Sequence, residues 1–217
     1  MAEPRSERMT DEELVAALAP LSLRSTLDPP AVAAAEGIGV TDPDDVAALV
    51  DHVDRGLFDS PFSPATDLGP DRRKEVAGSV AFQAVAAQVV NPVLLAHRVL
   101  GIGLFPLIGD VRWRPDDWVV RYGLSPLTRG VSTSSTGAVI DRFRQQISHT
   151  LADRINAVLP VPLPARLLVG NERAAIRTAL VAVGEAPPGR FERDSCCLIH
   201  LAGLMPCDEC PLSEASA

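Results

Sequence analysis

The four cysteines of this 217-residue chain lie close together near its end, at Cys196, Cys197, Cys207 and Cys210. Random placement would scatter four residues over the whole chain, so the clustering indicates one shared site. Thiolates bind zinc and iron–sulfur clusters, and they also form disulfides. The Cys-x-x-Cys half has the spacing that lets a tight turn direct both thiolates at one metal.

Disulfides are the least favoured of these three chemistries. Adjacent Cα atoms are about 3.8 Å apart, which is below the separation of about 4.4–6.8 Å that a bridge prefers. Zinc ribbons normally use a second short spacer, whereas Cys196 and Cys197 are direct neighbours. Neighbouring side chains of an extended segment point to opposite faces, so both can bind one centre only if the backbone twists there. A two-iron cluster, being a wider target than a single ion, tolerates that arrangement better, and zinc remains the alternative.

A longer pattern surrounds these cysteines, from Phe191-Glu-Arg-Asp-Ser-Cys-Cys to Cys-Asp-Glu-Cys-Pro-Leu212. It resembles the C-terminal signature of the FhuF-like ferric-siderophore reductases. The spacer between the two cysteine pairs, residues 198–206, is one residue shorter here than in that family. Residues 76–93 and the Leu-Leu-Val-Gly-Asn-Glu run at 167–172 are also similar, so the resemblance covers about residues 41–212.

The resemblance implies that all four cysteines are ligands of a 2Fe–2S cluster. It implies an iron–sulfur oxidoreductase of the cytoplasm that transfers one electron to the Fe(III) of a ferric siderophore and so releases Fe(II). The chain has neither a P-loop nor a dinucleotide fingerprint, so we expect the electron donor to be another protein, such as a ferredoxin. Two alternatives stay open: a zinc-stabilised binding or structural protein, and a 2Fe–2S electron carrier with no siderophore substrate.

Other residues that could contact a ligand have a plainer structural interpretation, which we prefer. One set is an aromatic and basic patch, and a second shares a helix face. Three histidines are also candidates, His200 as a further cluster ligand and the other two as core or surface residues. The patch comprises Trp113, Trp118, Arg112, Arg114 and Arg121; the helix face comprises Arg142, Gln145, Gln146, His149 and Arg154; the other two histidines are His52 and His97.

Composition excludes several classes of function. The formal net charge is −8 and aromatic residues make up 4% of the chain, which disfavours nucleic acids and anionic lipid surfaces as partners. The first residues are polar and acidic, so no signal peptide is expected and the predicted location is the cytoplasm. Residues 76–96 carry no formal charge, but polar residues such as Ser79 and Asn91 favour a buried helix over stable membrane insertion.

The predicted fold is an α-rich α+β domain, mainly helical, with a small antiparallel sheet and a C-terminal lobe in which cysteines bind the cluster. Residues 1–186 form the helical ligand-binding or reductase domain, and residues 187–217 form the cluster-binding segment. Capping patterns predict helix starts near Thr10 and Asp42. The remaining elements are a helix from 43 to about 55 that ends at Gly56, a helix at 71–90 that restarts or kinks at Pro92, strands at 104–108 and 118–122 around a turn at 114–117, a helix at 138–158, and a helix that starts at 170–171 and ends at Gly184.

Overall fold

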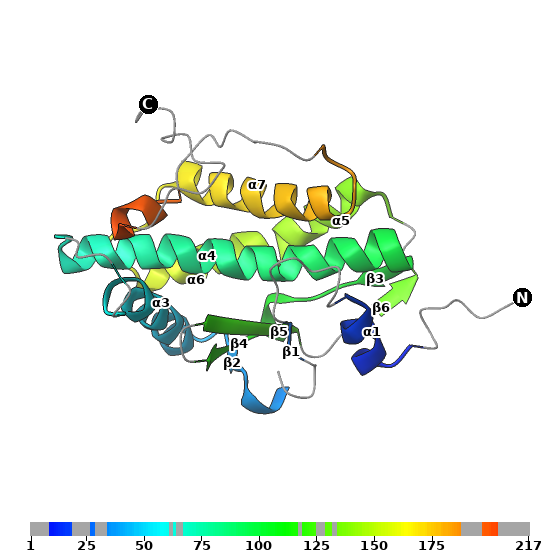
Figure 1. Ribbon diagram of the computed structural model, residues 1–217, viewed down its shortest axis with the longest axis horizontal. Coiled ribbons are helices and arrows are strands. Elements are labelled where there is room, and N and C mark those ends of the chain that lie inside the picture. The colour runs from blue at the N-terminus through cyan, green and yellow to red at the C-terminus, as the bar shows by residue number, and fades with distance from the viewer. Residues whose placement is uncertain are drawn as a thin grey trace, which may run out of the picture.

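A computed structural model describes residues 9–18, 27–28, 34–60, 63, 67–116, 119–124, 129–131, 134–187 and 197–203. One long helix, α4 (Pro70–Leu95), runs through the centre of the molecule. Figure 1 shows α7 (Ala165–Ala182) along one side of α4, with α3 (Pro43–Phe58) and a small sheet on the other side. This arrangement confirms the predicted α-rich α+β fold with a small sheet.

The first two helices begin where the capping patterns predict. In α1 (Asp11–Leu18), Thr10 accepts from the Glu13 amide while its own amide donates to the Glu13 carboxylate, which is a complete capping box. Helix α3 begins at Pro43, after the Asp42 side chain accepts a hydrogen bond from the Asp44 amide at 2.8 Å.

The predicted end of α3 at Gly56 is wrong, because the helix continues to Phe58. The extra residues are held by contacts with α4. The Arg73 guanidinium lies 4.8 Å from the centre of the Phe58 ring, and it also pairs with Asp59 immediately after the helix. These tertiary contacts outweigh the low helix propensity of one glycine.

An ionic cluster, which we call the α3–α4 cluster, joins these two helices. Arg73 donates to the carboxylates of Asp54 and Asp59, and Lys74 donates to those of Asp51 and Asp54. The Asp54 side chain is mostly buried, whereas those of Asp51 and Asp59 are about half exposed. The cluster therefore lies at the edge of the helix pair, where water reaches most of its members.

The prediction at Pro92 was a restart or a kink of the helix, and the restart is wrong because α4 passes through this residue. Pro92 has no N–H to donate to the preceding turn, yet the α-helix continues to Leu95. It then widens into a π-helical turn, η3 (Ala96–Leu100), and ends at Gly101, whose φ is +67°. Residues 89–96 are all buried, so packing on every side outweighs the lost hydrogen bond.

The second half of the chain folds back along α4. Helix α5 (Thr136–Phe143) continues through a second π-helical segment, η5 (Arg144–Ser148), into α6 (His149–Val158), which matches the extent predicted for one helix. Helix α7 begins at Ala165, directly after Pro164. The predicted start at Gly170-Asn171 is therefore wrong, because both residues lie inside α7 and are buried against its neighbours.

The strands form two small sheets. The larger has the order β1–β5–β4–β2, and its centre is an antiparallel pair of β4 (Val111–Asp116) and β5 (Val119–Leu124). The short strand β1 (Leu27–Asp28) pairs parallel with β5. The short strand β2 (Ile38–Gly39) pairs antiparallel with β4. The smaller sheet pairs β3 (Ile102–Leu104) with β6 (Arg129–Val131).

The strand positions differ from those predicted around the turn. Residues 114–116 belong to β4 and so do not form the predicted turn, and residue 117 lies outside the described residues. Pro115 pairs with Val120 within this hairpin, so a proline that indicates a turn in the sequence lies in a strand here. Prolines are compatible with strands at positions whose N–H is not needed by the ladder.

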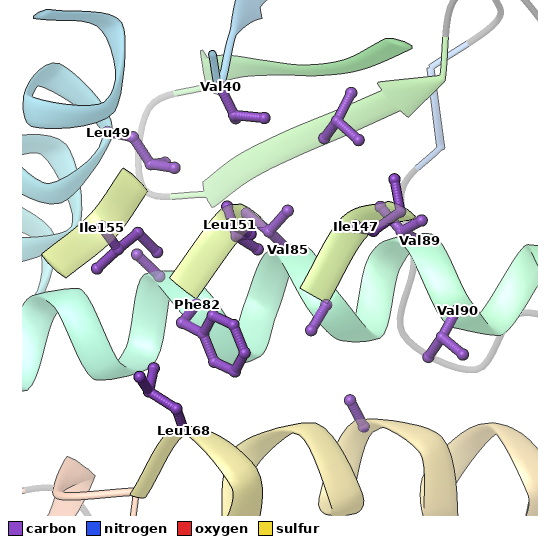
Figure 2. Close-up of a cluster of buried hydrophobic side chains, with 14 of the residues drawn as sticks. Val40, Leu49, Phe82, Val85, Val89, Val90, Ile147, Leu151, Ile155 and Leu168 are labelled. Carbon is purple, nitrogen blue, oxygen red and sulfur yellow. The ribbon is translucent and has the colours of Figure 1, made fainter. Parts of the chain in front are cut away.

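The main core lies on both sides of α4. Figure 2 shows Val85, Val89, Leu151 and Ile155 filling the space between α4, α6 and the sheet. On the other side, Phe82 points from α4 toward α7, where Leu168 lies. Helix α4 therefore contributes to both packing layers, which explains why so much of its surface is apolar.

Candidate functional site

The predicted site centres on four cysteines, of which the structure describes one. Cys196, Cys207 and Cys210 lie outside the described residues. Cys197 is 3% exposed and lies two residues before a short 3₁₀ helix, η6 (Ile199–Ala202), which packs on α4. In Figure 1, η6 lies beside the first turns of α4 and α7, so Cys197 leads into this end of the helix pair.

A buried polar network holds the main chain at Cys197. The Ser79 hydroxyl on α4 donates to the Cys197 carbonyl at 2.8 Å. The Asn171 side-chain amide on α7 donates to the Ser79 carbonyl at 3.1 Å and lies 3.0 Å from its hydroxyl oxygen. Ser79 and Asn171 are each 0% exposed. We call Ser79, Asn171 and Cys197 the serine–asparagine latch, because these hydrogen bonds join the main chain at Cys197 to the seam between α4 and α7.

The backbone changes direction immediately after Cys197. Leu198 has a φ of +69°, the only positive φ at a non-glycine residue in the part of the chain that the structure describes. Such a conformation is uncommon for a residue with a branched side chain and persists only where surrounding contacts impose it. Leu198 also packs against the main core, which supplies such a contact. This turn lies directly after Cys197 and changes the direction of the chain that leads into η6.

A second buried polar group lies on the neighbouring residue of α7. The Glu172 carboxylate accepts from Arg144 Nε at 2.8 Å and from the Ser148 hydroxyl. Glu172 is 7% exposed and Ser148 is 2% exposed. The hydrogen bond to Glu172 raises the pKa of the Arg144 guanidinium above its ordinary value, so the guanidinium stays charged.

A cavity of about 540 Å³ opens beside this ion pair, between the α5–η5–α6 segment and α7. Its walls include Arg144, Ser148 and Glu172, together with His149 from α6 and Arg173 from α7. The cavity is lined on the α4 side by Phe82, which is one helical turn from Ser79. The cavity and the latch thus occupy adjacent faces of the same helices.

The aromatic and basic patch does not form a ligand site among the described residues. Trp113 is 3% exposed and belongs to the core, where its ring lies 6.1 Å from that of His52. Arg114 pairs with Glu36 at 3.0 Å, and the Arg112 side chain covers Gly39 on the sheet. The side chains of Trp118 and Arg121 lie outside the described part. Trp113 and Arg114 therefore have structural roles inside strand β4, whereas the plainer interpretation placed them at a strand edge and in a solvated turn.

The residues predicted to share one polar helix face line two different pockets or lie on the exposed surface. His149 lines the cavity, whereas Arg142 stacks 4.7 Å from the Phe105 ring centre and, with Gln146, lines a different and smaller pocket. Gln145 and Arg154 are exposed and line neither space. The π-helical segment changes the angular spacing along this helix, so residues predicted to share one face do not.

The three candidate histidines lie in different surroundings. Burial, and secondarily the charge of Arg55, lowers the pKa of His52 below its ordinary value. Burial and the neighbouring Arg98 likewise lower the pKa of His97. His200 lies half-buried in η6, close to the cysteine segment along the chain. Low pKa values keep His52 and His97 neutral at physiological pH, which agrees with core or surface roles for both.

Three residues of the site were missed by reasoning from sequence: Ser79, Asn171 and Glu172. Ser79 is a polar residue inside an otherwise apolar helical segment, whereas Asn171 and Glu172 follow one another and precede Arg173. Polar groups are buried only where hydrogen bonds compensate, so the apolar surroundings of Ser79 were a usable signal. What the pattern could not supply was the partner, since Ser79 and Asn171 are 92 residues apart.

Two further features of the described chain add little to this geometry. Among the described residues, no group of three or more His, Cys, Asp or Glu side chains is placed to bind a metal. Residues 70–100 form one helix long and apolar enough to cross a membrane, and 72% of its most apolar window is buried inside the protein. Comparisons of the chain with protein-family models, curated proteins and solved structures found no match.

Proposed function

We propose that this protein is a cytoplasmic iron–sulfur oxidoreductase that reduces the Fe(III) of a ferric siderophore. The proposed ligands of its 2Fe–2S cluster are Cys196, Cys197, Cys207 and Cys210. The observation that carries the proposal is the latch, which fixes the main chain of Cys197 on a buried helix seam beside a ligand-sized cavity. A solvated tail with no function would not need two fully buried polar residues to hold it.

Cys197, the proposed ligand that the structure describes, is compatible with such a group. Four thiolates are the donor set that a 2Fe–2S cluster takes, and Cys197 lies in a dry, buried position. The left-handed backbone at Leu198 turns the chain directly after the adjacent cysteine pair. The Ser79 hydroxyl satisfies the Cys197 carbonyl, so the segment can be buried without an unpaired acceptor.

The chemistry asked of the protein is a single electron transfer. Siderophore oxygens bind the hard Fe(III) ion tightly and bind Fe(II) far more weakly, so one electron makes the chelate labile. When bound, a 2Fe–2S cluster supplies that electron at a potential set by charge, hydrogen bonding and exposure. The chain's own residues have to hold the segment in place and exclude water from it, and both tasks fall to the latch and the surrounding α4–α7 seam. The electron itself comes from a separate protein of the ferredoxin type.

The test begins with protein purified without oxygen from cells supplied with both iron and zinc. We expect about two irons and two acid-labile sulfides per chain, little zinc, and a visible spectrum that bleaches with dithionite. Replacing Cys197→Ser should remove most of the iron and sulfide. Ser213→Ala, a change just beyond the last cysteine, is the control and should leave them unchanged.

A second step separates the reductase from its two alternatives. Dithionite-reduced protein is freed from excess reductant and mixed with a ferric siderophore and a colorimetric Fe(II) chelator. We expect reoxidation of the protein and capture of Fe(II) in equal amounts. One zinc and no sulfide would replace the proposal by a zinc-stabilised binding protein. A cluster that no ferric chelate reoxidises would replace it by an electron carrier.

A further inference from the structure

The cavity beside the latch has the size and lining of a small-molecule site. Its volume of about 540 Å³ lies within the range of about 300–1,000 Å³ typical of ligand pockets. Ligand pockets are mostly apolar, with a few polar groups that converge on one region. The apolar part here comes from three helices and includes Phe82, Ala152 and Leu168.

The polar wall of the cavity is rigidly built. Glu172 is buried and held from two sides, by Arg144 and Ser148, the first and last residues of η5. π-Helical segments inside α-helices are frequent at functional sites. A guanidinium has five N–H donors, and the bonds to Glu172 and Asp141 leave Arg144 with further donors. Glu172 therefore orients Arg144 while balancing its charge.

Two further cationic or polar donors border the same space from different helices. His149 comes from the start of α6, and Arg173 comes from α7, next to Glu172. Both are exposed residues, so they lie where a ligand would enter. Together with Arg144 they supply N–H donors beside the apolar floor. The exposed Asp153 also lines the cavity, so its polar wall carries two arginines and two acids, Asp153 and Glu172.

The cavity is close to the cysteine segment. Phe82 lies three residues after Ser79 on α4, and Leu168 lies three residues before Asn171 on α7. Three residues are about one helical turn, or roughly 5 Å along the axis. A molecule in the cavity would thus lie about one turn from the two residues that hold Cys197.

We propose that this cavity is the binding site of the ferric chelate, an inference that rests on the proposed function. The apolar floor contacts the organic backbone of the chelator. Arg144, His149 and Arg173 donate hydrogen bonds to the metal-binding oxygens, where the negative charge of a siderophore is concentrated. This placement puts the organic backbone against Phe82 and Leu168, so the bound chelate as a whole lies about one helical turn from the residues that hold Cys197.

The test uses gallium(III) chelates as probes, because Ga(III) has the charge and coordination of Fe(III) but accepts no electron from the protein. Binding of a gallium trihydroxamate and a gallium tris-catecholate to the anaerobically purified full chain is measured by calorimetry. Ala152→Leu fills the cavity, and we expect it to weaken binding about tenfold or more. Ala157→Leu, at an exposed position of α6 outside the cavity, is the matched control and should bind as the unchanged protein does.

A second pair of variants avoids the risk that Ala152→Leu disturbs folding. Arg173→Gln removes a charged donor at an exposed site, and we expect a loss of affinity of about fivefold or more. Arg154→Gln removes an exposed arginine that does not line the cavity and should change nothing. Thermal unfolding of all four variants identifies any that are misfolded.

The outcomes separate this site from the proposed function. Binding that is lost in both cavity variants and kept in both controls supports the site, even if metal analysis finds zinc and ends the reductase proposal. Binding that none of the variants alters would place the chelate elsewhere and overturn the site. A cluster-containing chain that binds neither gallium chelate would overturn the site while leaving the cluster intact.

Discussion

Two polar clusters fasten α4 to its neighbours, and they differ in charge and exposure. The α3–α4 cluster consists of five charged side chains at the helix edge, where several are a quarter to a half exposed. The serine–asparagine latch on the α7 side contains no charge, and its two side chains are fully buried. Water screens the first cluster, whereas nothing replaces a lost partner in the second. From this comparison we expect the smaller, neutral cluster to contribute more to the free energy of unfolding than the larger, charged one.

The largest expected effect comes from placing a charge in the latch. Asn171→Asp replaces a buried amide donor by a carboxylate that faces the Ser79 carbonyl, and we expect destabilisation of about 3 kcal/mol or more at pH 8. Burial raises the pKa of such an acid above its unfolded value, so the folded state binds the proton more tightly. The variant should therefore regain stability as the pH falls toward 5.5. Urea unfolding at both pH values measures this.

A matched control is available at Asn156, whose side-chain oxygen accepts from the Leu163 amide at 2.8 Å. An aspartate there keeps the acceptor, so Asn156→Asp should cost less than about 1 kcal/mol. Equal losses in the two variants would show that Asn171 acts by bulk and position and that its amide hydrogens are not important.

A smaller effect is expected when the latch loses its hydroxyl. Ser79→Ala leaves the buried Cys197 carbonyl without the partner that the structure shows, and we expect a loss of about 1–3 kcal/mol. The same change should loosen the cysteine segment, so iodoacetamide should modify Cys197 of the metal-free protein several times faster. Peptide mass spectrometry after timed labelling gives the rate for this residue.

Ser135→Ala serves as the control for this prediction. Ser135 caps α5 by accepting from the Ala138 amide at 3.2 Å, and its loss should also cost about 1 kcal/mol. It lies in a different part of the molecule from the latch and should leave the labelling rate of Cys197 unchanged. If both serine variants accelerate labelling equally, general destabilisation explains the effect and the latch has no special part in it.

The smallest effect is expected in the ionic cluster. Asp54→Asn removes the most buried acid of the α3–α4 cluster, and we expect about 1 kcal/mol of destabilisation. Asp59→Asn, at a half-exposed acid paired with the same arginine, should cost less than about 0.5 kcal/mol and nothing measurable in 1 M salt. Chemical unfolding at two salt concentrations tests both. A loss in Asp54→Asn that exceeds that in Asn171→Asp would reverse the comparison.

Local chemistry determined the parts of the fold that were predicted well. The capping box at Thr10 and the Asp42-Pro43 start of α3 depend on contacts within one turn, and both are as predicted. Gly56 and Pro92 were interpreted by the same local rules and did not end their helices. At those positions contacts from distant residues decided the outcome, and a single sequence contains no record of them.

The site was predictable only in part for a related reason. Clustering and spacing identified the cysteines, because all four lie in one short segment. The latch joins residues from three separate segments, so no short pattern contains it. Asn171 illustrates the difficulty, since a Gly-Asn pair is a common helix start and here lies in the middle of α7. Its role became visible only when Ser79 was placed opposite.

The bond between Ser79 and Cys197 spans 118 positions of the chain. The surface of α4 and α7 on which η6 docks must form before η6 can bind to it. Closing so long a loop is also entropically costly. We therefore expect the cysteine segment to order last during folding and to detach first under stress. During synthesis, α4 and α7 would pack together while the Ser79 hydroxyl is still exposed to solvent. The hydroxyl would become buried when Cys197 reaches it.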